Sequence, residues 1–135
     1  MEIKNFFQKI FSGSREPDLP KPVRNKFEAR FSESINVEWQ KTGEQFEAVF
    51  YRDDLEHIAT FDADGSVVCL KINLPLTVLP ELINQNARKE GELMNAIRIE
   101  CKDEIQYEMI VRDEMLVRYT LLLNVEGKIL NKKQL

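Results

Sequence analysis

The sequence lacks most of the patterns that mark a catalytic or metal-binding protein. Its 135 residues include one histidine and two cysteines, too few for a zinc site built from His and Cys ligands. It contains no glycine-rich phosphate loop, no Gly-x-Ser-x-Gly nucleophile motif and no His-Glu-x-x-His metal motif. We therefore expect no catalytic site, no bound metal and no cofactor, in a protein that is not an enzyme.

An excess of positive charge is missing as well. The net charge is −4, with 19 Lys and Arg residues against 23 Asp and Glu residues mixed along the chain. A protein that binds nucleic acid needs a basic surface that displaces counterions from phosphates, so the charge argues against a nucleic-acid partner. No apolar run approaches the roughly 18 residues of a membrane-spanning helix.

The first residues do not have the pattern of a secretory signal, which needs an uninterrupted apolar stretch. Lysine, asparagine and glutamine residues break up the apolar ones in this segment. The sequence therefore favours a cytoplasmic protein. In that compartment Cys69 and Cys101 are expected to be reduced core residues, with a disulfide as the alternative.

The apolar residues near the N-terminus follow the spacing of one helical face. They recur at i, i+3, i+4, i+7 and i+8, and three prolines between positions 17 and 22 exclude a continuing helix. We expect a short amphipathic helix and linker over residues 1–18, followed by a single domain over residues 19–135. The apolar face of the helix consists of Ile3, Phe6, Phe7, Ile10 and Phe11.

This helix has three interpretations. It packs on its own domain, docks in a groove of a protein partner, or rests on a membrane surface as an amphipathic anchor. Only Lys4 and Lys9 supply positive charge, and Glu2 offsets one of them. Among the functional alternatives this charge favours a protein groove over a lipid surface.

The domain begins with a helix and continues in strands. Apolar spacing predicts a helix over residues 22–31, after which the period changes to two. Polar turns near residues 41–44 and 52–54 separate three strands, and an Asp-Gly turn leads into a fourth. Residues 19–74 are thus predicted to form one helix and four antiparallel strands.

The same pattern recurs over residues 75–135. Leu79-Pro80 follows Leu19-Pro20 by 60 positions (79 − 19), and Gly127 follows Gly65 by 62 (127 − 65). Residues 97–101 match residues 35–39 at an offset of 62 (97 − 35), which makes Cys101 the equivalent of Trp39. Agreement in pattern, order and turn residues indicates a duplication.

The chain also resembles a known family. Its motifs are Leu-Pro at 19–20, Ile-Asn-Val-Glu-Trp at 35–39, Gln-Phe-Glu-Ala-Val-Phe at 45–50 and Thr-Phe-Asp-Ala-Asp-Gly at 60–65. These segments are similar to the PepSY-like, β-lactamase-inhibitor-protein-like family. The resemblance extends from Leu19 to about Leu130 and is more degenerate in the second repeat.

This resemblance implies an α+β fold. The two helix-plus-four-strand units would form one eight-stranded antiparallel sheet with both helices on one face. Many members of the family look secreted, whereas this chain lacks the signal pattern. Inhibitor-like members project a hairpin loop into their target, which makes the turn at Asp53-Asp54 a candidate contact.

Two further places could be read as sites. Asp62 and Asp64 could begin a calcium loop, but residues 66–71 supply almost none of the further oxygen ligands, so we interpret the segment as a tight turn with Gly65 at positive φ. His57 could activate a cysteine nucleophile. Because both cysteines alternate into predicted core positions, we expect structural roles for all three residues.

The two faces of the predicted sheet differ in composition. If Trp39, Phe46 and Phe50 point toward the helices together with Phe61, the opposite face mixes apolar and aromatic side chains with Arg and Glu. Such a mixture is typical of a protein interface, although scattered apolar residues are normal on a surface and the N-terminal helix could also cover them. The candidate partner-binding residues are Val49, Tyr51, Ile58, Arg98, Ile110, Arg118 and Leu122.

These observations predict a non-catalytic protein-binding module that uses the sheet face, the N-terminal helix or both. A membrane-surface adaptor anchored by residues 3–11 is one alternative. A small-ligand-binding protein or enzyme with its pocket near His57 is another. The expected partner is a protein, and a homo-oligomer is compatible with the sequence.

Overall fold

The computed structural model describes residues 16–135, which divide into two compact units. The N-terminal unit comprises residues 16–72 of the described chain, and the C-terminal unit comprises residues 73–135. The predicted N-terminal helix, with Ile3, Phe6, Phe7, Ile10 and Phe11, lies outside the described residues.

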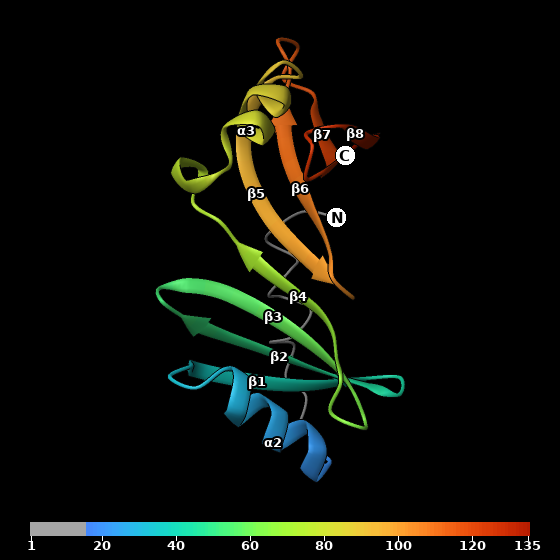
Figure 1. Ribbon diagram of the computed structural model, residues 1–135. Coiled ribbons are helices and arrows are strands. Elements are labelled where there is room, and N and C mark those ends of the chain that lie inside the picture. Colours follow the sequence, from blue (N-terminus) through green and yellow to red (C-terminus); the bar gives the residue numbers. More distant parts are fainter. Residues whose placement is uncertain (1–15) are drawn as a thin grey trace. The chain divides into compact units, whose positions relative to one another are not determined.

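Eight strands form one antiparallel sheet in sequence order, and each unit has its own helix (Figure 1). This arrangement confirms the predicted α+β fold of two helix-plus-four-strand repeats. The N-terminal unit contains α2 (Lys21–Arg30), β1 (Ile35–Thr42), β2 (Gln45–Arg52), β3 (Leu55–Asp62) and β4 (Val67–Asn73). The C-terminal unit contains a 3-10 helix (Leu76–Val78), α3 (Glu81–Arg88), β5 (Glu92–Cys101), β6 (Glu104–Arg112), β7 (Arg118–Asn124) and β8 (Ile129–Gln134).

Aromatic rings fill the core between α2 and its strands. The ring centroid of Phe27 lies 5.2 Å from that of Trp39 and 5.2 Å from that of Phe50, both in edge-to-face orientation. Each such pair stabilises the fold by about 0.5–1.5 kcal/mol in addition to the contribution of its buried area. The inward-facing set expected from the sequence packs in this cluster and comprises Trp39, Phe46, Phe50 and Phe61.

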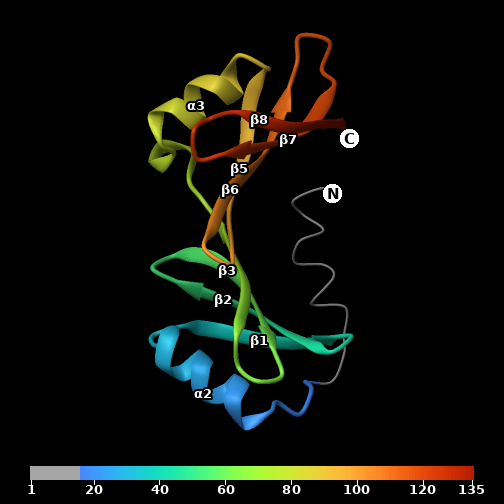
Figure 2. The same ribbon diagram turned by 45° about the vertical axis from the view of Figure 1, so that its right-hand side comes forward.

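The core of the C-terminal unit is mainly aliphatic. Figure 2 shows α3 lying along one face of this unit's strands. Ile83 and Ala87 of α3 are fully buried and belong to one cluster with Met109 and Leu121. The two repeats therefore share a helix-on-sheet plan while filling it with different side chains.

The repeat alignment of the first strands was wrong. Ala48 and Met109 occupy equivalent buried positions, and their partners across the hairpin are Trp39 and Ala96. The true offset between β1 and β5 is thus 57 (96 − 39), because the β5–β6 hairpin is longer than the β1–β2 hairpin. The predicted offset of 62 differs from 57 by an odd number of residues. Side chains of β5 that were predicted on one face of the strand therefore lie on the other face. Ala96, and not Cys101, takes the place of Trp39.

The first and last strands of the sheet carry features that disturb their outer edges. The β1–β2 register shifts between Ile35 and Glu38, where Asn36 adopts a positive φ of 54°. All of β8 after Ile129 is exposed, including Lys132 and Lys133. Both strands therefore end the sheet with irregular or charged edges.

A glycine turn contacts the helix in each unit. Gly65 has a φ of +92°, and its N–H donates to the carbonyl of Asp62 at 2.9 Å. A Cβ on Gly65 would lie 2.6 Å from the backbone oxygen of Pro22. Gly127 has a φ of +84°, and a Cβ on Gly127 would lie 2.6 Å from the side-chain nitrogen of Asn86. The segment at 62–65 is thus a tight turn with Gly65 at positive φ, as the sequence predicts, and it lies against α2.

Gly65→Ala should destabilise the protein more than Gly127→Ala. Alanine at either positive φ costs about 1–2 kcal/mol, but only Gly65 meets rigid backbone, so its total loss should reach about 3 kcal/mol. The Asn86 side chain next to Gly127 can move, which limits that loss to about 1–2 kcal/mol. Urea unfolding of both variants measures the difference; equal losses would contradict the argument.

Candidate functional site

The N-terminal unit has an apolar strip on the face opposite α2. In the antiparallel register Val49 pairs with Glu38 on β1 and with Ile58 on β3. Alternation places all three away from the aromatic core. Val49 is only 1% exposed and Ile58 only 8%. Tyr51 on the same face donates its hydroxyl to Glu56 at 3.3 Å, and this carboxylate raises the pKa of Tyr51.

The corresponding face of the C-terminal unit holds three of the predicted residues. Ile110 pairs with Thr120 and is 7% exposed, Leu122 is half-buried, and Arg118 is exposed. All three lie on the face opposite Met109 and Leu121. Their role in binding a partner stays a prediction, as it does for Val49, Tyr51 and Ile58.

Arg98 does not lie on this face. It pairs with Tyr107, on the side of the strands that also carries Ala96 and Met109. There its guanidinium binds the Glu100 carboxylate at 3.1 Å. The prediction that placed Arg98 on the open face was wrong because the longer β5–β6 hairpin changes the register.

His57 is a buried packing residue. Its ring stacks on Phe50 with centroids 5.1 Å apart and an interplanar angle of 17°. Nδ1 lies 2.8 Å from the carbonyl oxygen of Leu55, to which it donates as the neutral tautomer. Burial is the main cause that lowers the pKa of His57, so the ring is held neutral. This environment suits a structural role.

The cysteines are not partners for His57. Cys69 pairs with Thr60, so it lies on the opposite face of the strands from His57. Cys69 and Cys101 are both disulfide-bonded, and the structure has no free thiol. The expectation of reduced cysteines in core positions was wrong, because it depended on the compartment inferred from the N-terminus. A Cys–His nucleophilic pair does not form.

The β6–β7 loop was not identified from the sequence. Met115 is 81% exposed and Leu116 is 70% exposed at its tip. One Oδ1 atom of Asp113 accepts the backbone N–H groups of Met115 at 2.9 Å and Val117 at 3.0 Å. The N–H of Leu116 donates to the Asp113 carbonyl at 3.0 Å. These bonds give the loop a defined conformation while two large apolar side chains face solvent.

Leu116 has an uncommon backbone conformation. Its φ is +63°, a region in which a bulky residue is strained and Gly or Asn is usual. In the first repeat the equivalent β2–β3 turn contains only Asp53 and Asp54, both at positive φ. The second loop has five residues between its strands, so it is three residues longer. No periodic pattern marks such an insertion.

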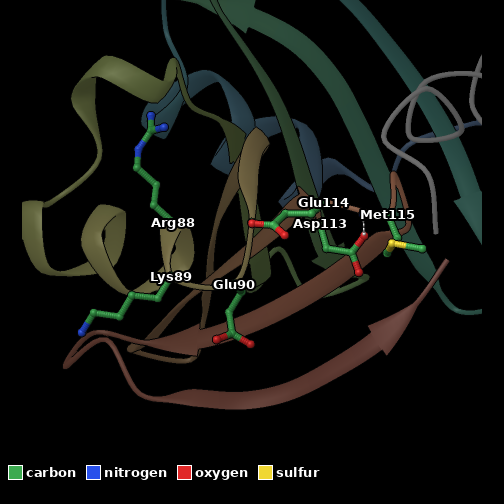
Figure 3. Close-up of a pocket in the computed structure, with 7 residues that line it drawn as sticks. Arg88, Lys89, Glu90, Asp113, Glu114 and Met115 are labelled. Atoms are coloured by element: carbon green, nitrogen blue, oxygen red, sulfur yellow. Dashed lines mark hydrogen bonds between the residues drawn. The ribbon is translucent and has the colours of Figure 1, made fainter.

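A pocket of about 450 Å³ lies between the end of α3 and this loop (Figure 3). Arg88 and Lys89 extend from the α3 side, while Asp113 and Glu114 come from the loop. Glu90 accepts a hydrogen bond from Lys132 at 3.2 Å. The pocket thus carries both signs of charge. Its lining residues are Arg88, Lys89, Glu90, Gly91, Asp113, Glu114 and Met115.

No cluster of three or more His, Cys, Asp or Glu side chains within residues 16–135 could hold a metal ion. The helices of this range are too short and too polar to cross a membrane. Asp64 accepts the backbone N–H of Ser66 at 2.8 Å, which lowers the pKa of Asp64. Its carboxylate therefore stabilises the turn.

The comparisons with known proteins identify the fold. No protein-family model matches the sequence, and no curated protein matches it significantly. A crystal structure of a BLIP-like protein from Bacteroides fragilis has a TM-score of 0.74 at 15% identity, covering 92% of this chain and 90% of that chain. The fold is BLIP-like.

Two further crystal structures share it. A proposed periplasmic protein from Bacteroides eggerthii has a TM-score of 0.77 at 14% identity, covering 87% of this chain and 90% of that chain. A DUF2874 family protein from Bacteroides ovatus has a TM-score of 0.76 at 17% identity, covering 87% of this chain and 89% of that chain. The BLIP-like part of the family resemblance is thereby confirmed for the fold, and the PepSY-like part stays a prediction.

The neutral, buried state of His57 predicts a specific pH dependence of stability. The unfolded chain binds a proton near pH 6.5, whereas burial lowers the pKa of His57 so that the folded protein binds it only at lower pH. The free energy of unfolding should therefore be constant above about pH 7 and decrease as the pH falls below 6.5.

The matched control is His57→Phe, which keeps a ring beside Phe50 and removes the only histidine. Urea unfolding at intervals from about pH 8 to pH 5.5 should show the decrease in wild type and a flatter profile in the variant. Parallel profiles would contradict the assignment.

Proposed function

We propose that the protein is a non-catalytic protein-binding module that inserts the tip of its β6–β7 loop into an apolar depression on a protein partner. The observation that carries this proposal is the exposure of Met115 and Leu116 on a hydrogen-bonded loop. Large exposed apolar groups that gather at one place mark interaction sites. Methionine adapts its shape to a binding surface.

The conformation of the loop supports this role. A strained residue persists only where its surroundings enforce it, and such residues concentrate at functional sites. Asp113 provides that enforcement through three backbone contacts around Leu116. Because the loop is ordered before binding, it loses little conformational entropy in a complex.

The pocket beside the loop adds a polar contact surface. Its Arg88 and Lys89 side chains lie on one side and its acidic loop residues on the other. A partner that receives Met115 could place a charged side chain in this space, where opposite charges on both sides fix its orientation. The similarity to a BLIP-like protein is compatible with such a binding role. The predicted sheet-face residues of the C-terminal unit, Ile110, Arg118 and Leu122, are a second, proposed contact.

We also propose an oxidising compartment, such as the periplasm, in place of the cytoplasm. Two disulfide-bonded cysteines in a chain of this size are typical of secreted or periplasmic proteins. One protein of the same fold is described as periplasmic. The cytoplasmic location expected from the N-terminus lacks this support.

A thiol-labelling experiment checks the disulfide. Protein extracted from the source cell under acid quench and denatured without reductant should not react with a maleimide–polyethylene glycol reagent. After reduction it should gain two adducts, one for each cysteine. Labelling of both cysteines before reduction would contradict the proposed compartment.

Substitution of the loop tip tests the binding function. Met115→Ser combined with Leu116→Asn should weaken capture of the partner by about 30-fold, the effect of losing roughly 2 kcal/mol at an interface centre. The same variant should be at least as stable as wild type, because asparagine tolerates the positive φ of residue 116.

The matched control is Val125→Asn, which removes an exposed apolar residue from the β7–β8 turn of the same unit. Binding is measured by affinity capture from an extract of the source cell with isotope-labelled quantification. A partner that is lost with the loop variant and retained with the control supports the proposal. Equal recovery of every partner by both variants contradicts it.

A further inference from the structure

The face opposite α2 carries two deeply buried apolar side chains. An antiparallel sheet with one solvated face normally places polar side chains there. Val49 and Ile58 are instead apolar, adjacent in register and below 9% exposure. Among residues 16–72 the helix lies on the other side, against the aromatic core.

A polar group on the same face is also without a partner. Gln40 pairs with Glu47 in the register, which places it on the side of Val49. Its buried side-chain oxygen accepts no hydrogen bond from the described residues. Buried polar atoms are nearly always satisfied, so a missing donor is expected above this face.

The sequence contains a segment suited to this position. Residues 3–11 lie outside the described residues and carry five apolar side chains at helical spacing. A helix of this length extends over about 13 Å, enough to cross two or three strands spaced about 4.8 Å apart. Lysine, asparagine and glutamine side chains on its flanks supply hydrogen-bond donors.

The connecting chain is long enough to reach the face. Leu19 packs against the aromatic core on the α2 side. Between Phe11 and Leu19 lie seven residues, which span up to about 23 Å when extended. Neighbouring layers of secondary structure lie about 10 Å apart, and β1 is the edge strand around which the chain would pass.

Charge distinguishes this face from the equivalent face of the C-terminal unit. The first face carries four acidic residues, Glu38, Glu47, Glu56 and Asp62, and one lysine, Lys71. The second carries as many basic as acidic residues, with Arg112, Arg118 and Lys133 against Glu92, Glu104 and Glu108. Residues 1–11 contain two lysines and one glutamate, a charge complementary to the first face.

We propose that residues 3–11 form an amphipathic helix that docks on the face opposite α2 of its own chain and covers Val49 and Ile58. This contact is separate from the β6–β7 loop and does not depend on the binding function proposed above. The N-terminal segment is then an internal packing element, and neither a membrane anchor nor a docking helix for another protein.

Photo-crosslinking of the full-length protein tests whether residues 3–11 cover the face opposite α2 of their own chain. Benzoylphenylalanine replaces Phe7, and protein grown in ¹⁴N medium is mixed with protein grown in ¹⁵N medium before irradiation. Crosslinks should join the segment to tryptic peptides 42–52 and 53–71, which contain Val49 and Ile58, within chains of one isotope. The same photoprobe at Gln8, on the polar side of the predicted helix, should yield about fivefold less of these products.

The other outcomes contradict the proposal. Crosslinks between chains of different isotopes would identify a second copy as the occupant. Crosslinks to lipid in the presence of phosphatidylglycerol vesicles, with loss of the intramolecular products, would identify a membrane anchor. Products confined to other peptides would exclude this face.

A second pair of variants tests the contact without a photoprobe. Phe7→Asp and Gln8→Asp introduce the same charge at adjacent positions, and both lie outside the described core. Phe7→Asp should increase bis-ANS fluorescence about fivefold, because the dye binds newly exposed apolar surface. It should also speed amide exchange in β2 and β3, while Gln8→Asp behaves as wild type. If both variants match wild type, the docking is excluded.

Discussion

One helix can cover only one face of a four-stranded sheet, and much of this structure depends on that constraint. In each unit the helix side holds the largest buried side chains, from Phe50 and Phe61 in one core to Ile83 and Met109 in the other. The opposite face must then be polar, or another element must cover it. In the N-terminal unit Val49 and Ile58 give this face an apolar strip. Whether the face opposite the helix is polar or apolar therefore determines whether another element must cover it.

Much of the fold could be predicted from the sequence, because alternation along a strand reflects which side of it is buried. The inward set around Trp39 and Phe61 followed from that rule. The register of β5 did not, because hairpin length changes the face of a residue without changing the alternation itself, and Arg98 was misplaced for this reason. The candidate site was harder to predict than the fold. Met115 and Leu116 lie in a loop, where neither periodicity nor composition separates an exposed apolar residue from a buried one.

Duplication gives the two units the same plan, and their differences show where each has specialised. The β2–β3 turn closes with two aspartates, whereas the equivalent β6–β7 loop has three further residues and a leucine at positive φ. The turns at Gly65 and Gly127, by contrast, both lie against the helix of their unit, the first against its backbone and the second against its side chains. Shared features thus serve packing, while the features unique to one repeat are the better candidates for recognition, since function depends on sites added to a common fold.

The irregular edges of β1 and β8 also affect how the protein behaves at high concentration. An unpaired strand edge is a template on which another chain can add a strand, and repeated addition leads to fibres. The bulge at Asn36 interrupts the donor and acceptor row of β1, and Lys132 and Lys133 bring positive charge to β8. A second molecule approaching either edge meets a broken hydrogen-bond pattern or like charges. The sheet is thereby protected against open-ended self-assembly.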